Sequence, residues 1–146
     1  MQVYLMRHAT AADAGATSDA LRPLTEQGRQ EARNAGKALR ERGTEIAVVL
    51  SSPRLRARET AELVVEGLGT KIAIEVREAL NCGATAAAYL GEIRAQNGPL
   101  LLVGHNPEMS AFAGAIAGRP VSFRPATLCA IDLEGESASL TWVRHP

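Results

Sequence analysis

Apolar runs alternate along the chain with amphipathic segments. Four runs stand out: VYLM (residues 3–6), IAVVL (46–50), IAIEV (72–76) and LLLV (100–103). We predict that each of them forms a β-strand. The first, second and fourth are almost uninterrupted apolar sequences, which is typical of strands covered by helices on both faces of a sheet.

The segments between these runs have helical spacing. In residues 25–42, small or apolar residues recur every three or four positions and most charges fall elsewhere; the stripe is Gly28, Ala32, Ala35 and Leu39. Residues 85–96 and 107–118 carry shorter stripes, namely Ala86, Leu90 and Ile93 in the first and Met109, Phe112, Ala113 and Ile116 in the second. Asn106 and Pro107 have the order of an N-cap followed by a proline at the first helical position.

Residues 127–143 read as two strands joined by a turn at 134–136. Together with the strand–helix alternation, they predict the α/β class: a three-layer αβα sandwich with a mostly parallel central sheet and a C-terminal β-hairpin. The sequence has no linker or internal repeat, and its 146 residues suit one domain over residues 1–146.

Composition narrows the class of protein. Sixteen basic residues balance 16 acidic ones, so no overall charge favours nucleic acid or an anionic membrane as a partner. No apolar run approaches the ~20 residues that span a bilayer, and no signal-peptide pattern opens the chain. Cys82 and Cys129 have neither metal-site nor redox spacing, and we expect both to serve packing in a reducing compartment. A cytoplasmic location is therefore predicted.

Histidines and arginines follow the predicted strands, at the ends where open α/β sheets bind ligands. The pairs, in strand order, are Arg7 and His8, Arg54 and Arg56, Arg77 and Glu78, and Gly104 and His105. Scattered surface residues rarely coincide in this way, so we expect a common site. The third histidine, His145, lies beside the C-terminus and is expected in a mobile tail.

Helical geometry separates the two arginines of the second strand end. Ser52 can cap the following helix and Pro53 can open it. Charged residues recur at steps of four residues and form one face of this helix: Arg54, Arg58, Glu62 and Glu66. We interpret this face as solvated, with an ion pair between Arg58 and Glu62. The inward stripe contains Thr60, Leu63 and Val64. Arg56 lines up with that stripe, so it needs an anionic partner.

Two arginines, two histidines and a helix N-terminus at one edge of the sheet favour a phosphate site. Guanidinium groups match phosphate oxygens with paired hydrogen bonds. A histidine there could be a donor, a general base or a nucleophile, and Arg7 and Arg56 would lower its pKa and keep it unprotonated. The sequence has no carboxylate cluster, HExxH motif or Walker loop, so we expect metal-free chemistry without a cofactor.

Four segments carry a family resemblance: MRHA (6–9), RPLTEQGRQEA (22–32), SSPRLRARETA (51–61) and LLVGHNPE (101–108). In this order they resemble the histidine phosphatase (phosphoglycerate mutase-like) superfamily, and the short chain is most similar to the SixA-type phosphohistidine phosphatases. The resemblance implies that His8 is the nucleophile that becomes phosphohistidine. It also implies that Arg7, Arg56 and His105 bind the phosphoryl group, with His105 as a hydrogen-bond donor.

Two further residues of the predicted site keep alternative interpretations. The resemblance places Arg22 at the rim of the pocket, and a structural salt bridge is the alternative. Glu78 is the only carboxylate between Glu75 and Glu92, which makes it the candidate general acid or else a surface residue. Many SixA-type sequences have an aspartate where this chain has Ala84. A dedicated acid matters less for a labile N–P bond than for an alkyl ester, whose alkoxide leaving group needs a proton.

The segment after the third strand predicts the substrate. Only about eight residues separate that strand from the next helix, so no lid is expected and the site would admit a side chain of another protein. We predict hydrolysis of phosphohistidine on a protein partner, with a general or small-metabolite phosphomonoesterase as the alternative. A mutase, which needs a closed site, and a non-catalytic phosphate-binding module are less consistent with the residues. The sequence does not specify which nitrogen of His8 attacks.

Overall fold

Six strands form one sheet in the order β3-β2-β4-β1-β5-β6 in the computed structural model, which describes all of residues 1–146. The strands are β1 (Gln2–Arg7), β2 (Val48–Ser51), β3 (Ala73–Val76), β4 (Leu100–Gly104), β5 (Leu128–Glu134) and β6 (Ser137–Arg144). The first four are parallel to one another, whereas β5 is antiparallel to β1, and β6 to β5. The predicted mostly parallel sheet and C-terminal hairpin are confirmed.

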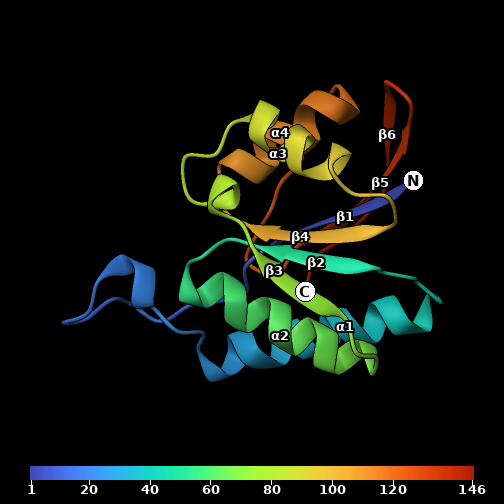
Figure 1. The fold of residues 1–146 in the computed structure, drawn as a ribbon. Coiled ribbons are helices and arrows are strands. Elements are labelled where there is room, and N and C mark those ends of the chain that lie inside the picture. The colour runs from blue at the N-terminus through green and yellow to red at the C-terminus, as the bar shows by residue number, and fades with distance from the viewer.

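Four α-helices cover the two faces of this sheet (Figure 1). Helices α1 (Glu26–Glu41) and α2 (Leu55–Leu68) lie on one face, and α3 (Ala86–Arg94) and α4 (Glu108–Ala117) lie on the other. Two 3₁₀ turns, η1 (Asp19–Leu21) and η2 (Glu78–Leu80), complete the order of elements. The predicted three-layer sandwich is therefore confirmed. No helix combines the length and the apolar character that crossing a membrane requires.

The core consists of two clusters, one under each pair of helices. In β1, Tyr4 and Met6 belong to the cluster that includes α1 and α2, whereas Val3 and Leu5 belong to the other. Because successive side chains of a strand point to opposite faces, a strand between two helical layers is apolar at every position. This explains the uninterrupted apolar run that precedes Arg7.

Helix α1 packs closely against the chain that leaves β1. All four residues of its predicted stripe are buried. A Cβ atom on Gly28 would lie 2.0 Å from the carbonyl oxygen of Thr10, so this approach requires glycine. Thr25 caps the helix, because its Oγ1 accepts a hydrogen bond from the N–H of Gly28 at 3.0 Å. The start of α1 is thus packed against Thr10, two residues beyond His8.

Two helices begin later than predicted. Helix α2 begins at Leu55 rather than Pro53, and Ser52 Oγ accepts from the N–H of Arg54 at 3.2 Å. Helix α4 begins at Glu108, after a cis Asn106–Pro107 bond. Both prolines therefore stand before their helices, in the turns that lead out of β2 and β4.

Two predictions about burial and mobility are wrong. Ala86 in α3 is exposed because it lies in the first turn, while Tyr89 is buried against Phe112 with ring centroids 5.4 Å apart. His145 does not lie in a free tail: β6 continues to Arg144, and the Nδ1 of His145 is 2.8 Å from the Oγ1 of Thr127.

Candidate active site

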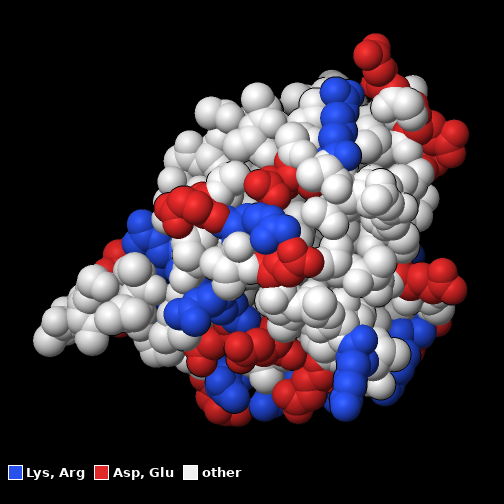
Figure 2. All heavy atoms as spheres, in the orientation of Figure 1, with Lys and Arg blue, Asp and Glu red and all other residues white.

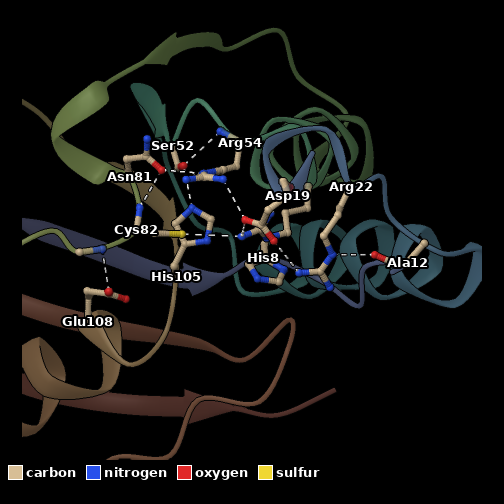
Figure 3. Close-up of polar contacts among 12 residues, drawn as sticks. His8, Ala12, Asp19, Arg22, Ser52, Arg54, Asn81, Cys82, His105 and Glu108 are labelled. Atoms are coloured by element: carbon tan, nitrogen blue, oxygen red, sulfur yellow. Dashed lines mark hydrogen bonds and ion pairs between the residues drawn. The ribbon is translucent and has the colours of Figure 1, made fainter. Parts of the chain in front are cut away.

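The carboxyl ends of β1, β2 and β4 meet and bring two histidines together. Arg7 is paired with Gly104 in the sheet register, and the N–H of His8 donates to the carbonyl oxygen of Gly104 at 3.0 Å. The rings of His8 and His105 consequently lie 5.4 Å apart between centroids. Both histidines are almost fully buried, and Figure 3 shows them side by side below Ser52, the residue that follows β2.

His8 presents one ring nitrogen that can act as a nucleophile. Its Nδ1 lies 2.8 Å from the carbonyl oxygen of Ala9, which can only accept a hydrogen bond, so Nδ1 carries the proton and Nε2 keeps its lone pair. Burial, followed by the charges of Arg56, Arg7 and Arg22, lowers the pKa of His8 to about 4. The ring is therefore neutral at neutral pH, as predicted, although burial is a larger cause than the adjacent arginines.

His105 is held in the same tautomer, by a different partner. Its Nε2 lies 2.7 Å from Ser52 Oγ, which already accepts from the N–H of Arg54. The only acceptor for the Ser52 hydroxyl proton is Nε2, so Nδ1 carries the ring proton of His105. Burial, followed by the charge of His8, lowers the pKa of His105 to about 3. This ring is thus a neutral hydrogen-bond donor.

Three buried donors in this region have no acceptor within the protein. They are the Nε atoms of Arg7 and Arg56 and the Nδ1 of His105. Arg7 is fixed through its Nη1, which donates to the carbonyl oxygen of Phe123 at 2.9 Å. Buried polar groups are rarely left unpaired in folded proteins. A tetrahedral oxyanion beside His8 would supply acceptors for all three donors.

One carboxylate, which the sequence analysis missed, binds the outer side of the arginines. Asp19 Oδ2 accepts from Arg54 Nη1 at 2.8 Å and from Arg56 Nη2 at 3.2 Å, and its Oδ1 accepts from Arg22 Nη1 at 3.2 Å. The carbonyl oxygen of Asp19 accepts from Arg56 Nη1 at 2.9 Å. Figure 3 shows the carboxylate between these guanidinium groups. In the sequence, only its spacing of three residues from Arg22 gave a signal.

The structure confirms some predictions about the arginines and shows that others are wrong. Arg56 is buried on the inward side of α2, as predicted, and has an anionic partner. Arg54, predicted to be solvated, instead belongs to the site, because it binds Asp19 and donates through Nε to Asn81 Oδ1 at 2.9 Å. Arg22 forms the salt bridge that was its alternative interpretation, at the edge of the same cluster. Arg77 is paired with Glu75 and Glu92 instead.

The expected pair between Arg58 and Glu62 does not form either. The guanidinium of Arg58 donates through Nε to the carbonyl oxygen of Pro53 at 3.0 Å. This bond draws Arg58 back toward the start of α2, where the carbonyl oxygen of Pro53 accepts no backbone hydrogen bond.

Glu78 and Cys82 line the loop that faces this cluster. Glu78 is exposed in η2, and its Oε1 accepts from Asn81 Nδ2 at 2.9 Å; two hydrogen bonds through Asn81 thus connect it to Arg54. Cys82, predicted to serve packing, is exposed, with its Sγ 3.7 Å from Arg56 Nη2. Cys129 is buried in β5. No group of three or more His, Cys, Asp or Glu side chains is placed to hold a metal ion.

A family comparison identifies the chain. The model of the histidine phosphatase superfamily (branch 1) matches residues 3–81, which include His8, Arg22 and Arg56. The chain belongs to this superfamily. The family and the enzyme class predicted from the sequence, a phosphatase, are confirmed.

Relatives of this histidine phosphatase include bacterial and animal proteins. Phosphohistidine phosphatase SixA of Escherichia coli (strain K12) is 32% identical over 153 residues, covering 100% of this chain and 94% of that protein. The structure of the protein histidine phosphatase SixA complexed with tungstate matches with a TM-score of 0.87 and 30% identity, covering 98% of this chain and 96% of that one. Serine/threonine-protein phosphatase Pgam5 of Drosophila ananassae is 36% identical over 111 residues. The match covers 75% of this chain and 35% of that protein.

Proposed function

We propose that this phosphatase hydrolyses phosphohistidine on a protein partner through a phosphoenzyme formed on the Nε2 of His8. The observation that carries the proposal is the pairing of a neutral, Nδ1-protonated His8 with three unpaired buried donors. The similarity to SixA over the full chain supports this choice of substrate. Arg7, Arg56 and His105 are the proposed phosphate-binding residues, and Arg22 contributes charge at the rim.

In the first step, the lone pair of His8 Nε2 attacks phosphorus and the P–N bond of the substrate breaks. The substrate imidazole leaves as a neutral ring when its other nitrogen has taken a proton from solvent, so no acid from the enzyme is required. His8 keeps its proton on Nδ1, bonded to the Ala9 carbonyl oxygen at 2.8 Å. The Nε atoms of Arg7 and Arg56 and the Nδ1–H of His105 donate to the phosphoryl oxygens throughout the transfer.

In the second step, water attacks the phosphoryl group on His8 and the P–Nε2 bond breaks. Because Nδ1 is still protonated, His8 leaves as the neutral ring that began the cycle. The proton released by the attacking water stays on the phosphate product or passes to solvent. Neither step therefore needs a proton transfer to or from His8.

The surroundings of the pocket support a protein substrate. Only residues 77–85 separate β3 from α3, and they form η2 and a short turn. Asp19, Glu78 and Cys82 around the pocket are all exposed. A phosphorylated side chain on another protein could reach such a site without the movement of a lid.

Phosphomonoester hydrolysis is the second candidate function, because the relative Pgam5 is named a serine/threonine-protein phosphatase. An alkoxide leaving group needs a proton. Hydrogen bonding to Arg22 and the charges of Arg56 and Arg54 lower the pKa of Asp19, so it is ionised and cannot supply that proton. Glu78 is the remaining proposed acid, and Glu78→Gln would slow monoesters more than phosphohistidine if it acts in this way.

A phosphoenzyme trap tests the proposal. Wild type, His8→Ala and the control His145→Ala are mixed with ³²P-labelled phosphohistidine peptide, quenched in alkali and assayed for acid-labile label. We expect label on wild type and His145→Ala and none on His8→Ala. Label on His8→Ala would refute the assignment of His8 as the nucleophile. Faster turnover of phosphate monoesters than of the phosphohistidine peptide would refute the proposed substrate class. Binding of the peptide without turnover would instead indicate a binding module.

A further inference from the structure

Asp19 places a negative charge on the donors where an anionic substrate would arrive. Its carboxylate and its carbonyl oxygen together accept four hydrogen bonds from Arg22, Arg54 and Arg56. The Nε of the same Arg56 guanidinium is buried and has no partner. Arg56 thus binds an internal anion through its two Nη atoms and keeps Nε for the proposed phosphoryl group.

Asp19 lies on the solvent side of Arg56. The side chain of Asp19 is 51% exposed, whereas that of Arg56 is 5% exposed. The segment between β1 and α1 that carries Asp19 extends outward from the layers of the fold (Figure 1). A phosphoryl donor that approaches Arg56 from solvent therefore passes the carboxylate, and its leaving group remains near that carboxylate during transfer.

Arg56 has contacts that do not depend on the charge of Asp19. Arg56 is buried within α2, next to Ala57 and one turn before the buried Thr60. Thr60 Oγ1 donates to the carbonyl oxygen of Arg56 at 2.7 Å and accepts from the N–H of Ala9 at 3.0 Å. Helix packing thus positions the buried base of this arginine, and the carbonyl oxygen of Asp19, which accepts from Arg56 Nη1 at 2.9 Å, stays in place when the carboxylate is neutralised. The charge of the carboxylate can therefore be changed separately from that contact.

We propose that Asp19 is a specificity-determining residue that weakens the binding of anions to the pocket and favours phosphoryl donors whose leaving group is neutral or cationic. The preference for such leaving groups rests on the proposed function. The imidazole of phosphohistidine takes a proton on its second nitrogen before it leaves, and that N–H can donate to the carboxylate of Asp19. A leaving group that carries its own carboxylate is repelled by the same charge.

Tungstate binding tests the charge effect without catalysis. Isothermal titration compares wild type with Asp19→Asn, Asp19→Glu and Asp13→Asn; Asp13 is an exposed aspartate of the same segment that forms no ion pair or hydrogen bond. Removing one charge within hydrogen-bond distance of the donors should tighten tungstate binding about tenfold in Asp19→Asn. We expect wild-type affinity in Asp19→Glu and Asp13→Asn.

Three results would overturn the proposal. Weaker binding by Asp19→Asn would show that the carboxylate orders the arginines for the anion. Unchanged binding would show that its charge is not felt in the pocket. Equal tightening by Asp13→Asn would show a general effect of loop charge. Circular dichroism melting verifies that each variant is folded. If Asp19→Asn does not fold, Asp19→Ser replaces it, and tighter tungstate binding is again expected.

Turnover tests the leaving-group preference. Two substrates are compared: phosphoglycolate, a monoester with a carboxylate, and phosphoimidazole. The kcat/KM for phosphoglycolate relative to that for phosphoimidazole should rise about tenfold in Asp19→Asn, because Asp19 repels only the carboxylate of phosphoglycolate. Equal changes for both substrates would overturn the preference and leave a structural role for Asp19. If the phosphoenzyme trap fails, the proposed function fails, while the tungstate titration still tests the charge effect.

Discussion

The buried wall of the candidate active site and the exposed loop that faces it contribute opposite charges to one site. The buried wall consists of the half-buried Arg7, which ends β1, and the buried His8, Arg56 and His105, which follow strands or lie in the first turn of α2. The exposed loop covers residues 13–22 and places Asp19 on the outer donors of the arginines. Surface charges are otherwise interspersed in sign on the face drawn in Figure 2.

The two regions differ in what fixes them, and this difference separates chemistry from selectivity. Strand pairing and helix packing hold the backbone of the buried wall, and Arg7 is fixed further by the carbonyl oxygen of Phe123. The exposed loop is held to the pocket mainly by ion pairs, which contribute little where solvent screens them. Changes to the wall should therefore alter rates strongly, whereas changes to the loop should alter which substrates are preferred.

The largest effect is expected from the wall itself. Arg56→Ala should lower kcat/KM for phosphohistidine about a thousandfold, because it removes a buried donor to the transferring phosphoryl group. Arg56→Lys should recover only part of this loss, since an ammonium group lacks the paired geometry of guanidinium. Steady-state kinetics on both variants checks this, with Arg33→Ala as a control, because Arg33 pairs with Glu66 in the helical layer. A loss below tenfold in Arg56→Ala would place catalysis outside the wall.

A change behind the wall should act on stability. Gly28→Ala places a Cβ atom 2.0 Å from the Thr10 carbonyl oxygen, so α1 or the chain after His8 must move. We expect the free energy of unfolding to fall by about 3 kcal/mol, measured by urea denaturation. The matched control is Gly91→Ala in α3, where a Cβ atom would have no neighbour within 4 Å; there we expect a gain of up to about 1 kcal/mol from helix propensity. Equal effects at the two positions would contradict the close approach.

The same contrast explains why the sequence predicted the residues of the wall but not those of the loop. The wall follows from simple patterns: apolar runs give the strands, the residues after them share one sheet edge, and helical spacing turns Arg56 inward. The outer loop has no such periodicity. Neither the contact of Asp19 with Arg54 and Arg56 nor the position of Cys82 beside Arg56 could be inferred, because segments far apart in the sequence meet only when the sheet has formed.

A smaller effect is expected from the serine that supports the wall. Ser52→Ala removes the partner of His105 Nε2, so the ring no longer holds its proton on Nδ1 toward the substrate. We expect kcat/KM to fall about tenfold, in line with the loss of a hydrogen bond that orients a functional histidine. The control is Ser51→Ala, because Ser51 is also buried but its hydroxyl donates to the carbonyl oxygen of Ser52. An equal loss in both variants would point to packing instead of orientation.

The most gradual effect is a dependence of stability on pH. Burial lowers the pKa of His8 from 6.5 to about 4, so between these values the unfolded chain binds a proton at His8 that the folded protein does not. The free energy of unfolding should therefore be independent of His8 above pH 6.5 and should fall as the pH drops toward 4, by at most about 1.4 kcal/mol per pH unit. His105 acts in the same direction, because its pKa is also lowered. Urea denaturation at pH 7, 6 and 5 should show a shallower dependence in His8→Asn than in wild type. An identical pH dependence in both proteins would mean that burial does not lower the pKa of His8. The neutral state of His8 would then need another explanation.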